Sequence, residues 1–126
     1  MTESIRILIV DDHPIVRQGL ATVLEQESDL SVVGQAANGV EAVAKARELL
    51  PDIILMDLQM PEMDGVEAIN RIMAEELKLG IIILSTYDTD DHIFRGIEAG
   101  ARGYLLKDSP PTEVVKAIRT VNRGSL

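Results

Sequence analysis

The stretch that decides the fold is IRILIVDD, residues 5–12, in which an apolar run broken only by one arginine ends in two aspartates. A second run, IILMD at residues 53–57, ends in Asp57. Continuous apolar runs of this length are typical of parallel strands that are covered on both faces. Ligand sites in open α/β sheets form outside the carboxyl ends of the strands, so we expect Asp11, Asp12 and Asp57 to meet at one place.

Three carboxylates at one place require a compensating cation. Two like unit charges about 4 Å apart repel each other by roughly 4 kcal/mol at an effective dielectric constant near 20. A hard divalent ion that takes oxygen ligands fits this site best. The chain also has Lys107 directly after the apolar run at residues 104–106, where a fixed ammonium group would end the last strand.

The rest of the chain alternates between strand-like and helix-like patterns, which predicts a doubly wound parallel sheet built from five βα units. Asn38 and Asp64 are predicted helix N-caps, because each is followed three residues later by a glutamate. Ile93, Phe94 and Ile97 are predicted to form a buried helical stripe. Strands are expected near residues 5–10, 31–36, 52–57, 80–85 and 103–106, and helices near 14–26, 39–50, 65–76, 90–99 and 111–122.

Length and composition exclude several classes of protein. A chain of 126 residues is expected to form one domain, and its 46% apolar content suffices for one core, which must be aliphatic because aromatic residues are nearly absent. The chain has no cysteine, so disulfides and thiolate chemistry are excluded. A net charge of −9 without a dense basic run argues against direct nucleic-acid binding. No apolar stretch is long enough for a membrane span and no signal peptide is evident, so a cytoplasmic location is expected.

The candidate site residues have a defined chemistry. A strand-end carboxylate such as Asp57 can act as a nucleophile towards a phosphoryl group. Lys107 alone could be a solvated surface lysine, and Ser85, which ends the fourth apolar run, could be a capping hydroxyl. Together with three acids at strand ends, both are predicted to contact a phosphoryl group. His13 adjoins the acids, so roles as a metal ligand and as a phosphorylated histidine are considered. Because it precedes Pro14 at a helix start, it is interpreted instead as the residue that enters the first helix.

Three motifs in order carry a resemblance to a known family. They are ILIVDDHP at residues 7–14, DLQMPEMDG at residues 57–65 and GARGYLLKD at residues 100–108. Together they resemble the receiver domains of two-component response regulators, and the resemblance covers residues 5–122. It implies a flavodoxin-like (βα)5 fold with strand order 2-1-3-4-5 and a single receiver domain over residues 1–126.

The resemblance also implies the roles of the acidic residues. Asp57 would accept a phosphoryl group from a sensor histidine kinase in a reaction that depends on Mg²⁺. Asp12, Asp57 and the backbone carbonyl of Gln59 would bind the Mg²⁺ ion, and Asp11 would act through water. Lys107 would contact the phosphoryl group. The chain would thus be a phosphoacceptor signalling domain that promotes its own phosphorylation and dephosphorylation, rather than an enzyme acting on other substrates.

Further roles concern the response to phosphorylation. Ser85 would be the switch hydroxyl and Tyr104 the aromatic side chain that rotates with it. Gln59 and Tyr87 would tune the lifetime of the phosphorylated state by controlling the access of water. The switch would change the surface formed by the fourth helix, the last strand and the last helix, as a shift between two populated states.

The residues after each motif point to a subfamily. The DDHP sequence at residues 11–14 and the aspartate after Lys107 are most similar to NarL/FixJ-type (LuxR-type) transcriptional regulators. This similarity implies a C-terminal helix-turn-helix domain that is absent from this chain, DNA binding through that domain only, and a homodimer that forms on phosphorylation. A stand-alone protein–protein switch is the alternative output, and the length of the gene product would decide between the two.

Two other classes of protein are disfavoured by particular residues. Phosphatases of the haloacid-dehalogenase type need a second acid two residues after the nucleophile, where this chain has Gln59. A dinucleotide-binding module needs a glycine-rich turn after the first strand. Residues 11–14 are instead Asp-Asp-His-Pro, and the two acids would repel a pyrophosphate.

Overall fold

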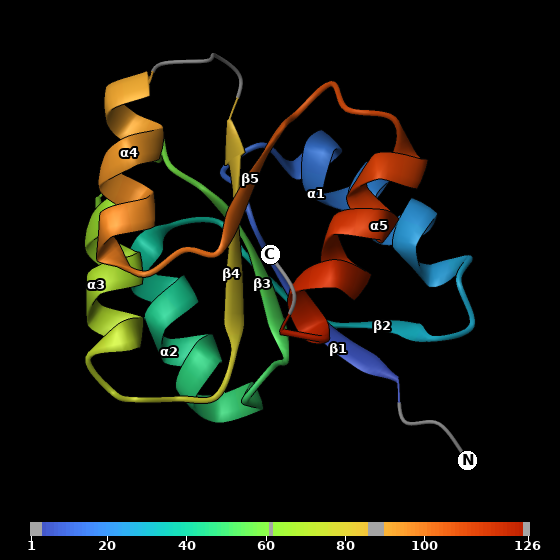
Figure 1. Ribbon diagram of the computed structural model, residues 1–126, viewed down its shortest axis with the longest axis horizontal. Helices are drawn as coiled ribbons and strands as arrows, with labels where there is room; N and C mark the ends of the chain where they lie inside the picture. Colours follow the sequence, from blue (N-terminus) through green and yellow to red (C-terminus); the bar gives the residue numbers. More distant parts are fainter. Residues whose placement is uncertain (1–3, 61, 86–89, 125–126) are drawn as a thin grey trace.

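The computed structural model describes residues 4–60, 62–85 and 90–124. Strands and helices alternate along these residues (Figure 1). Every predicted boundary lies within one residue of the observed one, except the end of the third helix. The elements are β1 (Ile5–Val10), α1 (Pro14–Glu25), β2 (Leu30–Ala36), α2 (Gly39–Leu49), β3 (Ile53–Asp57), α3 (Gly65–Met73), β4 (Gly80–Ser85), α4 (Asp90–Ala99), β5 (Gly103–Leu106) and α5 (Pro111–Asn122).

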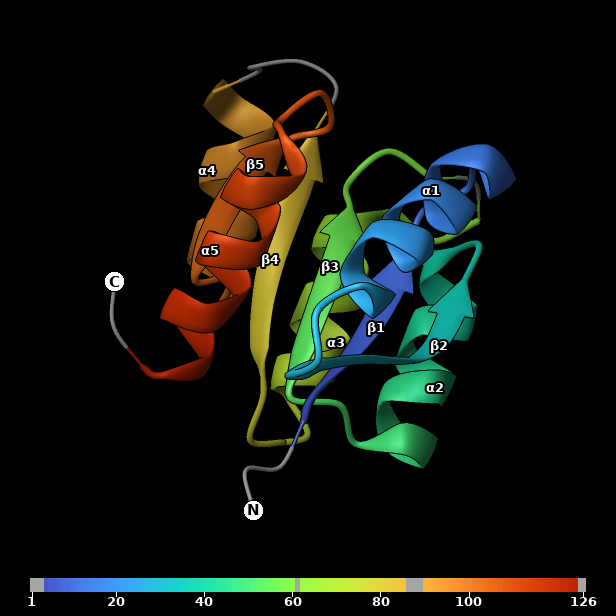
Figure 2. The same ribbon diagram turned by 90° about the vertical axis from the view of Figure 1, so that its right-hand side faces the viewer.

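The five strands form one parallel sheet in the order β2-β1-β3-β4-β5, which confirms the predicted order (Figure 2). Val10 pairs with Met56, so β1 and β3 end side by side. Asp57 pairs with Leu84, and Ser85 is therefore one residue further along the neighbouring strand. The register alone brings the ends of β1, β3 and β4 to the same edge of the sheet.

Two helical layers cover the sheet. Helices α1 and α5 lie on one face, and α2, α3 and α4 lie on the other (Figure 1). The residues of β1 alternate between the two cores: Ile7 and Ile9 belong to the core under α1 and α5, whereas Leu8 and Val10 belong to the core under α2 and α3. Burial on both sides explains why the strand sequence is continuously apolar. The buried hydrophobic residues of the described chain are all aliphatic, as predicted.

Two helices begin at the predicted caps. The side chain of Asn38 accepts a hydrogen bond from the backbone N–H of Glu41, and that of Asp64 accepts one from Glu67, both at 2.9 Å. The reciprocal half of the capping box is not formed. The carboxylate of Glu41 instead accepts from the backbone N–H of Ala37. Each N-cap therefore satisfies one free N–H of its helix, which is the main stabilising contribution of such residues.

The predicted length of α3 was wrong. The sequence pattern extended this helix to residue 76, but α3 ends at Met73. Glu76 has a φ of 56°, in the left-handed region, which an α-helix cannot include. The segment from Met73 to Glu76 therefore turns the chain towards β4.

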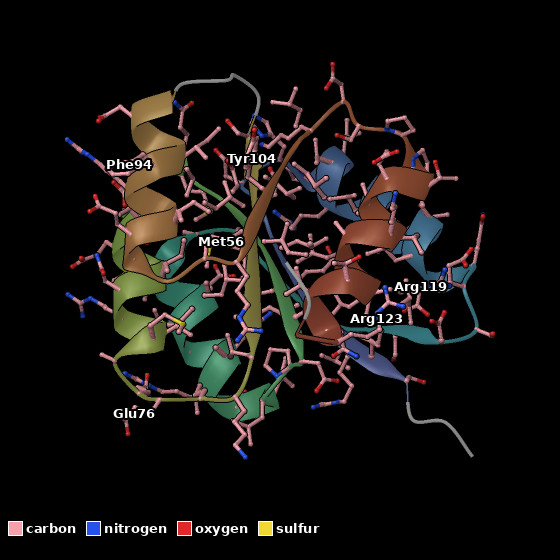
Figure 3. All side chains as sticks on the ribbon, viewed as in Figure 1. Met56, Glu76, Phe94, Tyr104, Arg119 and Arg123 are labelled. Atoms are coloured by element: carbon pink, nitrogen blue, oxygen red, sulfur yellow. The ribbon has the colours of Figure 1, made fainter. Side chains whose placement is uncertain are left out.

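The predicted buried stripe on α4 was also wrong in part. Ile93 is buried, but Phe94 is 60% exposed and Ile97 is 41% exposed. The buried face of α4 runs through Ile93 and Gly96, and a methyl group at Gly96 would overlap the side chain of Ile83. Phe94 and Ile97 each follow a residue of that face by one position, and both side chains are exposed (Figure 3 labels Phe94). Within the described residues, no helix has the length and apolar character needed to cross a membrane.

Candidate functional site

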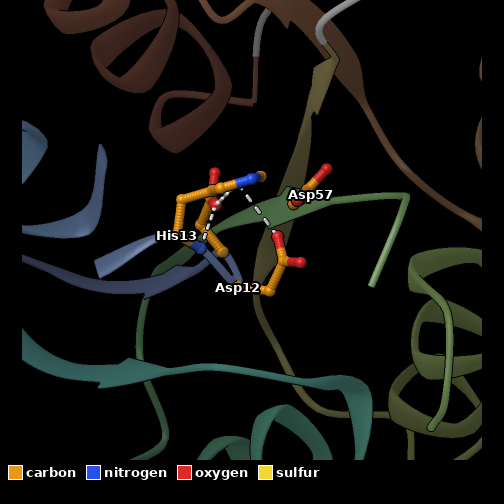
Figure 4. Close-up of side chains that lie close together, drawn as sticks. Asp12, His13 and Asp57 are labelled. Carbon is orange, nitrogen blue, oxygen red and sulfur yellow. Dashed lines mark hydrogen bonds and ion pairs between the residues drawn. The ribbon is translucent and has the colours of Figure 1, made fainter. Parts of the chain in front are cut away.

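The acidic residues meet at the carboxyl edge of the sheet, as the sequence predicted (Figure 4). Asp11 and Asp12 directly follow β1, and Asp57 is the last residue of β3. Asp11 is fully buried and Asp57 is 3% exposed. Asp11, Asp12, His13 and Asp57 each offer a potential ligand atom, and these atoms lie within 4.8 Å of one another. Adjacent parallel strands thus bring three carboxylates into one cluster.

Lys107 supplies the positive charge of this cluster. Its backbone N–H donates to the carbonyl of Ser85 at 2.8 Å, which continues the contact between β4 and β5 by one residue. Its Nζ lies 2.8 Å from Oδ2 of Asp11 and 3.1 Å from Oδ2 of Asp57. Burial lowers the pKa of Lys107, but the contacts with these two carboxylates outweigh burial and raise it. Lys107 therefore remains an ammonium ion in the site.

Asp57 is held in an environment that disfavours its charged form. Burial raises its pKa to about 6, although the hydrogen bond and charge of Lys107 act in the opposite direction. Oδ1 accepts a hydrogen bond from the backbone N–H of Gln59 at 3.2 Å, and Oδ2 contacts Lys107. At neutral pH, Asp57 is mostly a carboxylate, but one that is poorly solvated. Such a carboxylate is suited to act as a nucleophile.

The donor set fits a hard divalent cation. Oδ2 of Asp11 and Oδ1 of Asp12 are buried, and neither has a hydrogen-bond partner, although the first lies 2.8 Å from the ammonium group of Lys107. The three carboxylates and one ammonium group leave two negative charges unbalanced. Buried oxygens without donors and an excess of two negative charges are what a divalent ion would satisfy. The acidic residues of this chain could therefore bind a metal ion such as Mg²⁺.

Three of the predicted switch and tuning residues, Ser85, Tyr104 and Gln59, lie in the described part of the chain. Ser85 is 8% exposed at the end of β4 and pairs with Leu106 of β5. Tyr104, on β5, is 52% exposed and does not belong to the core. The side chain of Gln59 is exposed, two residues after Asp57. Tyr87 lies outside the described residues.

Sequence reasoning placed His13 but did not predict its contacts with the acids, and it missed Arg17. His13 lies at the N-cap of α1, as interpreted, but its Nδ1 is also 3.1 Å from Oδ1 of Asp11 and from Oδ1 of Asp12. Arg17, one turn into α1, donates from Nη1 to the carbonyl of Asp11 at 2.6 Å. The sequence did carry a signal for the position of His13, because a residue before proline is restricted to extended conformations and this one directly follows two acids. Arg17 had no sequence signal.

Comparison with known proteins agrees with this architecture. The model of the family described as response regulator receiver domain matches residues 7–119. The transcriptional regulatory protein LiaR of Bacillus subtilis is 48% identical over 120 residues, which are 95% of this chain and 57% of LiaR. The uncharacterized transcriptional regulatory protein YxjL of the same organism is 45% identical over 97% of this chain and 56% of its own length. The chain thus spans little more than half the length of these relatives.

Solved structures show the same fold. The signal receiver domain of the putative response regulator NarL from Mycobacterium tuberculosis superposes with a TM-score of 0.93 at 35% identity, covering 97% of this chain and 98% of that domain. A LuxR-family response regulator from Aurantimonas gives a TM-score of 0.91 at 38% identity, over 98% of this chain and 88% of its own. The family match covers most of this chain, and the similar regulators are of the transcriptional type. The chain therefore belongs to the receiver domains of two-component response regulators.

Proposed function

We propose that Asp57 is the phosphoacceptor of this receiver domain and that its phosphorylation controls a transcriptional output. The observation that carries the proposal is the environment of Asp57. It is a buried carboxylate with a pKa raised to about 6, one oxygen of which faces the ammonium group of Lys107 at 3.1 Å. Two further carboxylates, of Asp11 and Asp12, lie beside it.

The chemistry follows from this arrangement. A carboxylate oxygen of Asp57 attacks the phosphorus of a phosphohistidine on a histidine kinase, forming a P–O bond. The P–N bond breaks, and its electron pair remains on the imidazole, which takes up a proton. Lys107 then balances the charge of the transferred group, because its Nζ already lies beside Asp57. Phosphoryl transfer depends mainly on positioning and charge, which this site provides.

A divalent cation completes the charge balance. Asp11, Asp12, Asp57 and the backbone carbonyl of Gln59 are the proposed residues that hold Mg²⁺. When bound, the ion supplies charge neutralisation for the phosphoryl oxygens as they approach the carboxylates. Lys107 contributes a second positive charge, since its Nζ contacts both Asp11 and Asp57.

The proposed switch uses the edge of the sheet next to the site. A phosphoryl group on Asp57 adds acceptor oxygens, by analogy with phosphoserine. The hydroxyl of Ser85, one residue past the position that pairs with Asp57, would move to donate to them. Tyr104, now 52% exposed, would turn towards the vacated space and change the α4-β5-α5 surface. Phe94 and Ile97 belong to the same surface and are available for a partner.

The proposal assigns the remaining parts of the signalling pathway to partners. A cognate sensor histidine kinase donates the phosphoryl group, and phosphorylation favours a homodimer. A C-terminal helix-turn-helix domain, as in transcriptional regulators of the NarL/FixJ type, binds the DNA. Gln59 and Tyr87 tune the lifetime of the phosphorylated state, and the protein acts in the cytoplasm. The similarity to longer transcriptional regulators over 95–97% of this chain supports this assignment.

Intact-mass spectrometry after incubation with Mg²⁺ and acetyl phosphate tests the proposal. Wild-type protein should gain one phosphoryl group, and the gain should disappear when Mg²⁺ is chelated or when Asp57 is replaced in Asp57→Asn. Asp64→Asn is the matched control, since it changes an exposed aspartate outside the cluster and keeps a good N-cap. A gain of equal size in Asp57→Asn would overturn the proposal.

A further inference from the structure

The imidazole of His13 occupies a position that a phosphoacceptor site does not require. Its Nδ1 forms a hydrogen bond with Oδ1 of Asp11 at 3.1 Å and also lies 3.1 Å from Oδ1 of Asp12 (Figure 4). A neutral imidazole carries only one N–H, so a proton on Nδ1 can serve at most one of these oxygens well. Oδ1 of Asp12 is buried and has no hydrogen-bond partner. The ring is thus close to this oxygen without satisfying it.

The backbone holds this position in advance. His13 precedes Pro14, which restricts it to extended conformations, and it has φ −98° and ψ 110°. Its N–H donates to Oδ1 of Asp11 at 2.8 Å, and Arg17 fixes the carbonyl of Asp11 from α1. The ring therefore needs little conformational ordering to remain over the acids. Ligands that are held in place in this way bind a metal with a smaller entropic cost.

The spacing of the atoms matches the ligand shell of one metal ion. Neighbouring ligands of an octahedral ion with bonds of about 2.1 Å lie roughly 3.0 Å apart. Nδ1 of His13 is 3.1 Å from an oxygen of each of the two acids. The ligand atoms of Asp11, Asp12, His13 and Asp57 all lie within 4.8 Å of one another. One nitrogen and three carboxylates can therefore surround a common centre.

We propose that His13 is an additional metal ligand through Nδ1, and that it makes this site select first-row transition ions over Mg²⁺. This inference rests on the proposed metal site of the phosphoacceptor. Mg²⁺ prefers oxygen ligands and gains little from imidazole, whereas Mn²⁺, Co²⁺ and Ni²⁺ bind imidazole increasingly well. The ring nitrogen thus adds selectivity to a cluster that carboxylates alone would leave as a general site for hard cations.

Calorimetric titration of the untagged protein with Ni²⁺ and with Mg²⁺ tests the inference, at a pH where free imidazole is neutral. In His13→Ala, the affinity for Ni²⁺ should fall by about tenfold or more, whereas the affinity for Mg²⁺ should change by less than about threefold. The matched control is His92→Ala, which removes the other histidine of the chain and should leave both affinities nearly unchanged. His13 is 64% exposed at its side chain, so the variant should fold.

A direct spectroscopic measurement complements the titration. Pulsed electron paramagnetic resonance of the Mn²⁺ complex should show coupling to a bound ¹⁴N nucleus in wild type and in His92→Ala, and no such coupling in His13→Ala. If wild type binds Mg²⁺ and His13→Ala keeps the wild-type preference for Ni²⁺ over Mg²⁺, the metal site stands but the role of His13 is overturned. Failure of wild type to bind either ion would instead contradict the metal site itself.

Discussion

The raised pKa of Asp57 predicts that this residue destabilises the fold at neutral pH. Burial holds its pKa at about 6, against 3.8 for an unperturbed aspartate. The folded state therefore binds a proton more tightly than the unfolded state does. Replacing Asp57 with asparagine removes this buried charge while keeping the side-chain volume. We expect Asp57→Asn to be more stable than wild type at pH 8 and to lose most of this advantage towards low pH.

The size of the effect follows from linkage. Because the folded pKa is raised, protonated Asp57 contributes stability that is complete below pH 3.8 and is lost as the pH rises through 6. A shift of about two pKa units, at 1.36 kcal/mol each, corresponds to about 3 kcal/mol in all. Between pH 5 and pH 8, wild type should lose about 1.4 kcal/mol relative to Asp57→Asn, since protonation at pH 5 is already incomplete in the unfolded chain.

Urea unfolding at several pH values between 5 and 8, in a metal-free buffer with chelator, measures this difference. The free energy of unfolding of Asp57→Asn minus that of wild type should rise steadily with pH across this range. Asp64→Asn serves as the exposed control, because it exchanges one good N-cap residue for another. A difference that is independent of pH, or that falls as the pH rises, would refute the reasoning.

Three further predictions concern neighbours of the site and the far end of α5. Lys107→Met leaves two buried carboxylates without their cation and should lower the free energy of unfolding by about 3–5 kcal/mol at pH 7.5 by urea unfolding; a loss below about 1 kcal/mol would contradict the pairing. Gly65→Ala should cost about 1–3 kcal/mol in thermal unfolding, because its methyl group would overlap the carbonyl oxygen of Asp57, and an unchanged melting temperature would argue against this close contact. Arg119 holds the pKa of Asp29 below its usual range by a side-chain hydrogen bond (Figure 3 labels Arg119). Arg119→Met should therefore raise the pKa of Asp29 in a carboxyl-detected NMR titration, and an unchanged pKa would contradict this pairing.

The sheet and the acidic cluster were predictable because they depend on strong, local signals. Strands buried on both faces must be continuously apolar, and the acid at the end of each run marks where the strand leaves the core. Parallel pairing then brings strand ends together without any information on side-chain packing. Asp11 and Asp57 were therefore placed correctly from the sequence, as was Lys107 at the end of β5.

The exposed face of α4 was not predictable from its own residues. Ile93, Phe94 and Ile97 fit a helical stripe, but the orientation of the helix was decided by Gly96, which lets α4 approach Ile83 closely. The spacing of hydrophobic residues does not predict this orientation of α4, because a glycine inside a helical pattern normally only lowers the helix propensity. The two exposed apolar side chains are the consequence.

The contacts of His13 and Arg17 were missed for a different reason. The end of β1 and the start of α1 were predicted at the observed residues, but hydrophobic spacing does not determine where the side chains of the connecting turn and of the first turn of α1 point. The early end of α3 at Met73 was missed because the left-handed conformation of Glu76 has no residue-specific signal in a glutamate.

Identification of the phosphorylated residue tests the central claim most directly. After incubation with Mg²⁺ and acetyl phosphate, borohydride reduces an acyl phosphate and converts the modified aspartate to homoserine, which peptide sequencing by mass spectrometry can locate. We predict homoserine at position 57 and unmodified aspartate at positions 11 and 12. Homoserine at position 11 or 12, or none at position 57 in protein that has gained a phosphoryl group, would contradict the account.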